Sequence, residues 1–75
     1  MNAARRKAIA DAVDQLQSAL STLETCRDEE REYYDNMPEG LQNSTKGEAA
    51  SEAADMLDEV VSAVEEAISN CESIK

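Results

Sequence analysis

One stretch divides this 75-residue sequence in two: Asp35-Asn36-Met37-Pro38-Glu39-Gly40-Leu41-Gln42-Asn43-Ser44-Thr45-Lys46-Gly47. It holds the only proline and both glycines of the chain. Pro38 lacks a backbone N–H and restricts the residue before it, so a first helix is expected to end near Asn36. Gly40 is expected to supply the positive φ of a turn. Thr45 and Glu48 have the spacing of a capping box, which predicts the start of a second helix.

Long segments without glycine or proline lie on both sides of this stretch. We expect one domain over 1–75, with a helix over 3–36, a loop over 37–45 and a helix over 46–74. Apolar residues recur in steps of three and four, which is the pattern of a coiled-coil seam. The first seam is Ile9, Val13, Leu16, Leu20 and Leu23, and the second is Ala50, Ala54, Leu57, Val61, Val64, Ile68 and Cys71. The predicted fold class is therefore all-α, an antiparallel two-helix hairpin.

Each predicted helix carries a second apolar row beside its seam. The rows are Ala12, Ala19, Cys26 and Tyr33 in the first helix, and Ala53, Val60, Ala67 and Ile74 in the second. An apolar face this wide exceeds what a two-helix contact covers. The chain is therefore expected to bind itself, as a homodimer or higher oligomer that forms a four-helix bundle.

The composition excludes several classes of function. Seventeen acidic against seven basic residues give a net charge of −10, which argues against binding to duplex DNA or to a membrane. The chain has no histidine, so the commonest zinc ligand and neutral-pH base are missing. No phosphate-binding loop or nucleophile–base pair is present. We expect no enzymatic activity, no metal and no cofactor.

The longest unbroken apolar run, Ala8-Ile9-Ala10, is far too short to span a bilayer. Asp11 and Asp14 interrupt what would be the apolar part of an export signal. A cytoplasmic protein is expected, in the host cytosol if a phage encodes it. Cys26 and Cys71 should then be thiols.

Polar residues stand on the first seam beyond Leu23. In one interpretation they form a layer that fixes register, with Arg27 paired to Glu30 or to a carboxylate on the facing helix. In the other they line a polar pocket for an anionic small ligand, whose residues would be Arg27, Glu30, Arg31, Tyr33 and Tyr34. We favour the first interpretation, because polar layers that set register are well attested.

Acidic residues form rows along the second helix. The residues are Glu52, Asp58, Glu59, Glu65, Glu66 and Glu72. Such rows usually form a solvated face that keeps a small bundle soluble. A second interpretation is a surface that imitates nucleic-acid phosphates and binds a basic host protein.

Three cations, Arg5-Arg6-Lys7, stand near the start of the first helix. Positive charge at that position opposes the helix macrodipole, so it does not stabilise the helix. In one interpretation this cluster is an anion site. We favour the other, in which the cations pair with Glu72 and its neighbours, since both ends of the chain fall at the same end of a hairpin.

The segment Arg27-Asp28-Glu29-Glu30-Arg31-Glu32-Tyr33-Tyr34-Asp35-Asn36-Met37-Pro38-Glu39-Gly40-Leu41-Gln42 resembles small acidic proteins of bacteriophages and mobile elements. These proteins carry a D-N-M-P-E-x-L-Q loop between two helices rich in alanine and glutamate, and most have no assigned function. The specific similarity covers about residues 27–48. It implies a helical hairpin and a phage or mobile-element origin.

Three functions follow as hypotheses. The first is a non-enzymatic binding protein that inhibits a host defence protein stoichiometrically through its acidic helix faces. The second is an oligomer that sequesters a signalling cyclic nucleotide at the polar pocket. The third is a structural or assembly role.

Overall fold

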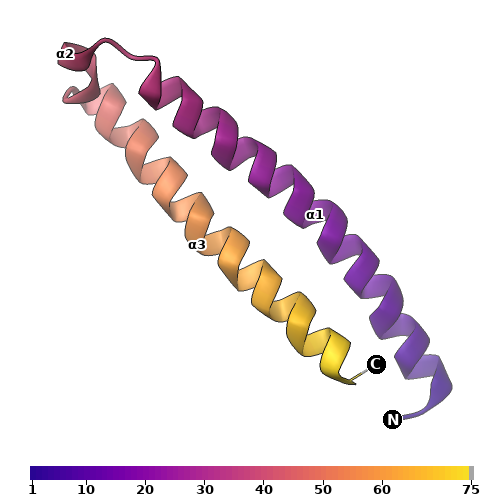
Figure 1. Cartoon of the computed structure of the whole chain (residues 1–75). Helices are drawn as coiled ribbons and strands as arrows, with labels where there is room; N and C mark the ends of the chain where they lie inside the picture. Colours follow the sequence, from indigo (N-terminus) through magenta and orange to yellow (C-terminus); the bar gives the residue numbers. More distant parts are fainter. Residues whose placement is uncertain (75) are drawn as a thin grey trace.

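The computed structural model describes residues 1–74, which form two long helices packed side by side and antiparallel (Figure 1). Helix α1 spans Ala3–Asp35 and α3 spans Thr45–Ile74, with the four-residue α2, Glu39–Gln42, between them. The molecule is a rod of 58 × 14 × 13 Å with both ends of the chain at the end opposite α2. The predicted all-α helical hairpin is confirmed.

Helix α1 begins and ends at asparagines. The side chain of Asn2 accepts a hydrogen bond from the backbone N–H of Arg5 at 2.8 Å, which caps the first turn. At the other end the N–H of Asn36 donates to the carbonyl of Glu32 at 2.9 Å. The restriction that Pro38 places on Met37 explains why the helix does not continue past this point.

The segment expected as a loop contains a short helix. Pro38 stands at the N-cap of α2, and its carbonyl accepts from the N–H groups of Leu41 and Gln42 at 2.8 and 3.2 Å. Gly40 lies inside this turn, and none of the described glycines has a positive φ. The expected left-handed turn at Gly40 is therefore wrong, because the chain reverses through a turn of helix and two bends.

The cap of α3 is one residue earlier than expected. The side-chain oxygen of Ser44 accepts from the N–H of Gly47 at 3.3 Å, and the Ser44 carbonyl accepts from Glu48 at 2.9 Å. Ser44 is thus the N-cap, and the capping box predicted for Thr45 and Glu48 is wrong. A side chain at position 47 would collide with the carbonyl oxygens of Leu41 and Gln42, so Gly47 allows α2 to pack on α3.

The buried core is small and lies along the predicted seams. Val13, Ala50, Ala54 and Val61 are 1–3% exposed, and the larger seam residues around them are half-buried. The second apolar rows are exposed along both helices. A single hairpin therefore covers its seams and leaves these rows in contact with water.

Candidate functional site

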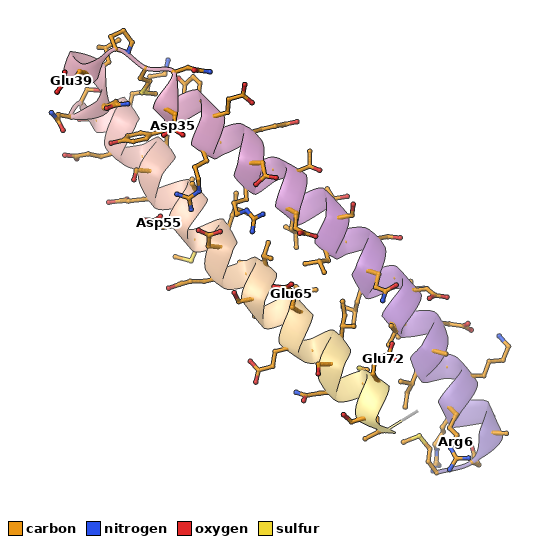
Figure 2. The ribbon with its side chains drawn as sticks, viewed as in Figure 1. Arg6, Asp35, Glu39, Asp55, Glu65 and Glu72 are labelled. Atoms are coloured by element: carbon orange, nitrogen blue, oxygen red, sulfur yellow. The ribbon has the colours of Figure 1, made fainter. Side chains whose placement is uncertain are left out.

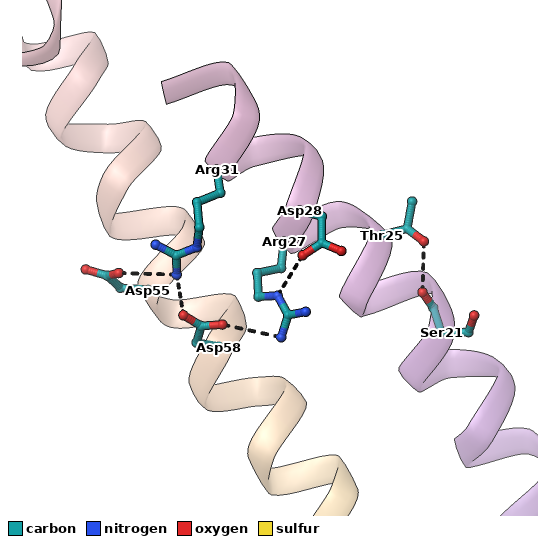
Figure 3. A network of polar contacts seen from close by, with 7 residues as sticks. All are labelled: Ser21, Thr25, Arg27, Asp28, Arg31, Asp55 and Asp58. Atoms are coloured by element: carbon teal, nitrogen blue, oxygen red, sulfur yellow. Dashed lines mark hydrogen bonds and ion pairs between the residues drawn. The ribbon is translucent and has the colours of Figure 1, made fainter. Parts of the chain in front are cut away.

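Five charged residues of α1 and α3 form a network of ion pairs between the turn and the middle of the rod (Figure 3). We call this network the ion-pair cluster: Arg27, Asp28, Arg31, Asp55 and Asp58. Arg27 Nη1 lies 3.4 Å from Asp58 Oδ1, and Arg31 donates to the other oxygen of the same carboxylate. Arg31 Nη2 also lies 3.6 Å from Asp55 Oδ1. One carboxylate of α3 thus bridges two guanidinium groups of α1, and this bridge links the helices at one axial position.

The Arg27 guanidinium is held by its own helix as well. Its Nε donates to Asp28 Oδ1 at 3.1 Å, and this hydrogen bond is the main cause that raises the pKa of Arg27. Desolvation by burial, the second-largest cause, lowers this pKa, and the attraction of Asp28, Asp58 and Glu24 raises it further. Of the two partners expected for Arg27 on its seam, the structure shows the facing carboxylate. Among residues 1–74 no ion pair joins Arg27 to Glu30.

The residues expected to form one polar pocket lie on different sides of the hairpin. With Val13 and Val61 at heptad position a, Arg31 and Asp58 both occupy position e, and they are in contact. Tyr33 occupies position g, and the ammonium of Lys46, also at g, lies 5.7 Å from the centre of its ring. The two guanidinium groups therefore flank one edge of the α1–α3 contact, and Tyr33 flanks the other.

Glu30 and Tyr34 occupy the seam between these edges. Both are half-buried, and the Tyr34 carbonyl accepts a hydrogen bond from Gln42 Nε2 at 3.1 Å. This bond joins the end of α1 to α2. An anion that binds Arg27 or Arg31 would have to displace the carboxylates already paired with them.

Tyr33 instead lines a hollow of about 320 Å³ at the turn, which we call the turn hollow. Its other lining residues are Asn36, Met37, Pro38, Leu41, Ser44 and Lys46. A hydrogen bond to Tyr33 raises the pKa of Lys46. Sequence reasoning left Lys46 out because it lies in the turn segment. The feature of the sequence that could have identified Lys46 is its position seven residues before Ala53, which places it in line with the second apolar row.

The second apolar rows of the two helices flank the same edge of the hairpin. The Tyr33–Lys46 contact joins position g of α1 to position g of α3, so residues at g share that edge along the rod. We call this set the apolar flank: Ala12, Ala19, Cys26 and Tyr33 of α1 with Ala53, Val60, Ala67 and Ile74 of α3. Tyr33 is 43%, Val60 37% and Ile74 54% exposed, and most of the others are alanines. Small side chains permit close approach of another helix pair.

Met56 widens the apolar flank on α3. It is 61% exposed, the highest value among the large apolar side chains of the described chain. Together with Ala53, Val60 and Ala63 it continues the steps of three and four outside the seam. Helix α3 thus carries one seam toward α1 and a second, uncovered one beside it.

The acidic rows of α3 lie about 100–160° around that helix from position g, which carries the apolar flank. We call them the acidic arc: Glu52, Glu59 and Glu66 at position f, with Asp58, Glu65 and Glu72 at position e (side chains are drawn in Figure 2). Asp58 belongs to the ion-pair cluster as well. Within residues 1–74 no ion pair engages Glu52, Glu59, Glu65 or Glu66. Glu59 and Glu66 border a shallow depression of about 400 Å³.

The N-terminal cations do not make the expected contact. Lys7 Nζ pairs with Asp11 Oδ2 at 3.1 Å, one turn along its own helix. In the described chain, residues 1–74, neither Arg5 nor Arg6 forms an ion pair with a carboxylate. The pairing of this cluster with Glu72 is therefore not observed over those residues.

Neither a metal site nor a membrane span is found over residues 1–74. No three His, Cys, Asp or Glu side chains in that range are placed to hold a metal ion. No helix in the same range is long and apolar enough to cross a bilayer. Both cysteines are thiols, with Cys26 exposed on the apolar flank and Cys71 half-buried on the seam. Comparison of the chain with protein-family models, curated proteins and solved structures gives no match.

Proposed function

We propose that this chain is a small, non-enzymatic binding protein that pairs with a second copy and presents the acidic arc to a basic partner protein. The observation that supports this is the separation of two surfaces on α3. Val60 is exposed at position g, and Glu59 and Glu66 are exposed about 100–120° away around the helix, with Met56 between them. A second copy can therefore cover the apolar side and leave the carboxylates available.

Self-association is supported by the size of the core. Over residues 1–74 only four apolar residues are buried, which is little for a hairpin of this length. Covering the apolar flank would remove Val60, Ile74 and the Tyr33 ring from water. Each fully buried aliphatic side chain contributes about 1.5–3 kcal/mol. Light scattering on the purified protein is expected to give twice the mass of one chain at micromolar concentration.

The acidic arc suits a basic partner because four of its carboxylates, those of Glu52, Glu59, Glu65 and Glu66, have no ion-pair partner within residues 1–74. Charge complementarity of this kind raises association rates and selects partners. The resemblance of residues 27–48 to small acidic phage proteins suggests a host defence protein as the partner, inhibited by stoichiometric binding. In this proposal the chain catalyses no reaction itself, and its binding inhibits the activity of the partner.

Charge reversal on the acidic arc tests this function. The variant Glu52→Lys/Glu59→Lys/Glu66→Lys should lose a partner that co-purifies with the wild-type chain and binds it again after purification. Asp58 is left unchanged because it holds Arg27 and Arg31. The matched control, Asp14→Lys/Glu29→Lys/Glu32→Lys, makes the same change of charge on α1 and should retain the partner. Equal binding by both variants would refute the acidic arc as the binding surface.

A further inference from the structure

Charge is distributed unevenly along the rod. The loop half, residues 20–60, carries twelve carboxylates and three cations. The terminal half, residues 1–19 and 61–74, carries five carboxylates and three cations. The dividing residues are close to the midpoints of α1 and α3, so the two halves are of similar length. Nearly all of the net negative charge therefore lies in the half that ends in α2.

Two symmetric arrangements cover the apolar flank with a second copy. A two-fold axis along the rod brings the two turns to the same end, and a two-fold axis across the rod brings them to opposite ends. Every neighbouring pair of helices is antiparallel in both arrangements. Helix packing alone therefore does not choose between them.

The charge distribution does choose. Turns at the same end place two loop halves together, each with an excess of nine negative charges. Turns at opposite ends place each loop half beside a terminal half, which has an excess of two negative charges. Helices in a bundle are about 8–10 Å apart, about one Debye length at physiological salt, so screening reduces this difference without removing it.

An unpaired cation fits the same arrangement. An axis across the midpoint of α1 brings Ala19 beside Ala19 of the partner subunit, with two small residues at the crossing. It also brings Arg5, at position g of α1, beside Tyr33 of the partner subunit, which occupies the same heptad position. Arg5 and Arg6 make no ion pair within residues 1–74. The facing segment of a second copy supplies an aromatic ring for Arg5.

We propose that the second copy packs on the apolar flank head to tail, with the turn of each chain beside the termini of the other. This inference rests on the self-association proposed above, and it adds the orientation of the partner. The molecule that covers the apolar flank is a second copy of this chain. Its orientation is selected because the acidic loop half is repelled less by the weakly charged terminal half than by another loop half.

Spin-label distances test the orientation. The label is attached at Glu39→Cys in a Cys26→Ala/Cys71→Ala background, and pulsed dipolar spectroscopy measures the distance between the two labels of a dimer. Glu39 is exposed, lies in α2 and is not one of the residues of the apolar flank. Head-to-tail packing separates the labels by about 50 Å, the length of a 33-residue helix. Turns at the same end would give a distance below about 30 Å.

The outcomes separate the two proposals. A monomer in light scattering of the unlabelled wild-type chain at micromolar concentration overturns both self-association and orientation. A dimer with a short distance overturns the orientation alone, and a dimer with a distance of about 50 Å supports both. Asn43→Cys, also exposed in the turn, is the second labelling site if Glu39→Cys does not fold. It should give the same result.

Discussion

Arg27 and Asp58 face each other across the hairpin, with Arg27 Nη1 3.4 Å from Asp58 Oδ1, while Arg31 occupies the other oxygen of that carboxylate. The side chain of Arg27 is 23% exposed and that of Asp58 48%. This is the point at which a polar interaction, and not apolar packing, specifies how α1 is placed along α3. Carboxylates of the chain itself therefore already neutralise both guanidinium groups that an anionic ligand would need.

Asp58→Asn is expected to destabilise the hairpin, because both guanidinium groups lose their shared carboxylate. Partly exposed ion pairs contribute modestly, so a loss of about 1 kcal/mol in the free energy of unfolding is expected. Urea denaturation measures it. Glu59→Gln makes the same charge change next to it without an ion pair to lose, and it should change the free energy little. The difference between the variants should shrink in high salt.

Gly47→Ala and Gly40→Ala should have opposite effects on stability. A methyl group at position 47 meets the carbonyl oxygens of Leu41 and Gln42, whereas nothing lies within 4 Å of a methyl group at position 40. We expect Gly47→Ala to cost about 1–3 kcal/mol, since α2 must move away from α3. Gly40→Ala should stabilise the chain by about 0.5–1 kcal/mol through the unfolded state. Thermal melts of both variants check this, and a stable Gly47→Ala would contradict the packing of α2.

Tyr33→Phe should lower the pKa of Lys46 toward the ordinary lysine value of 10.5, because the hydrogen bond that raises it is lost. Because the pKa of Lys46 is higher in the folded than in the unfolded chain, the contribution of its charged form to folding stability is complete below the unfolded-state pKa. It is lost as pH rises through the folded pKa. The wild-type chain should therefore show this loss at alkaline pH, and the variant should not. An NMR titration of the Lys46 side chain measures the pKa directly, and the same pKa in both proteins would show that the Tyr33 hydroxyl does not raise it.

Val60→Glu should shift the proposed dimer to monomer, because it places a carboxylate at the centre of the apolar flank. Burial of an unpaired charge costs several kcal/mol, enough to raise the dissociation constant at least about a hundredfold. Ser62→Glu adds the same charge on the other side of α3, where the residue is exposed, and should leave the dimer intact. Sedimentation equilibrium of both variants decides. If Val60→Glu remained a dimer, the apolar flank would not be the contact surface.

The hairpin was predictable from the sequence because its signals are local. Steps of three and four from Ile9 and from Ala50, with Pro38 between them, indicate two helices and a reversal without any knowledge of their contact. The uncovered second rows followed from the same pattern. Exposed Val60 and Ile74 agree with what the pattern predicts for a single hairpin.

The turn and the partner of Arg27 were less predictable because they depend on contacts between elements. Ser44 and Thr45 are both good caps, and the choice depends on how closely Gly47 approaches the carbonyl of Gln42. The choice of Asp58 over Glu30 depends on the axial offset of the helices, which a heptad pattern does not specify. The role of Lys46 was not predicted for the same reason, since its contact with Tyr33 joins α3 to α1 across the hairpin.

The uneven charge of the two halves also makes this rod of 58 Å an electric dipole along its length. The dipoles of two antiparallel helices largely cancel, so the side-chain charges dominate it. In the field of a cationic surface a single hairpin turns so that α2 leads the approach. A head-to-tail pair has no such axial dipole, and it would meet the same surface broadside, with the long carboxylate rows of α3 toward it.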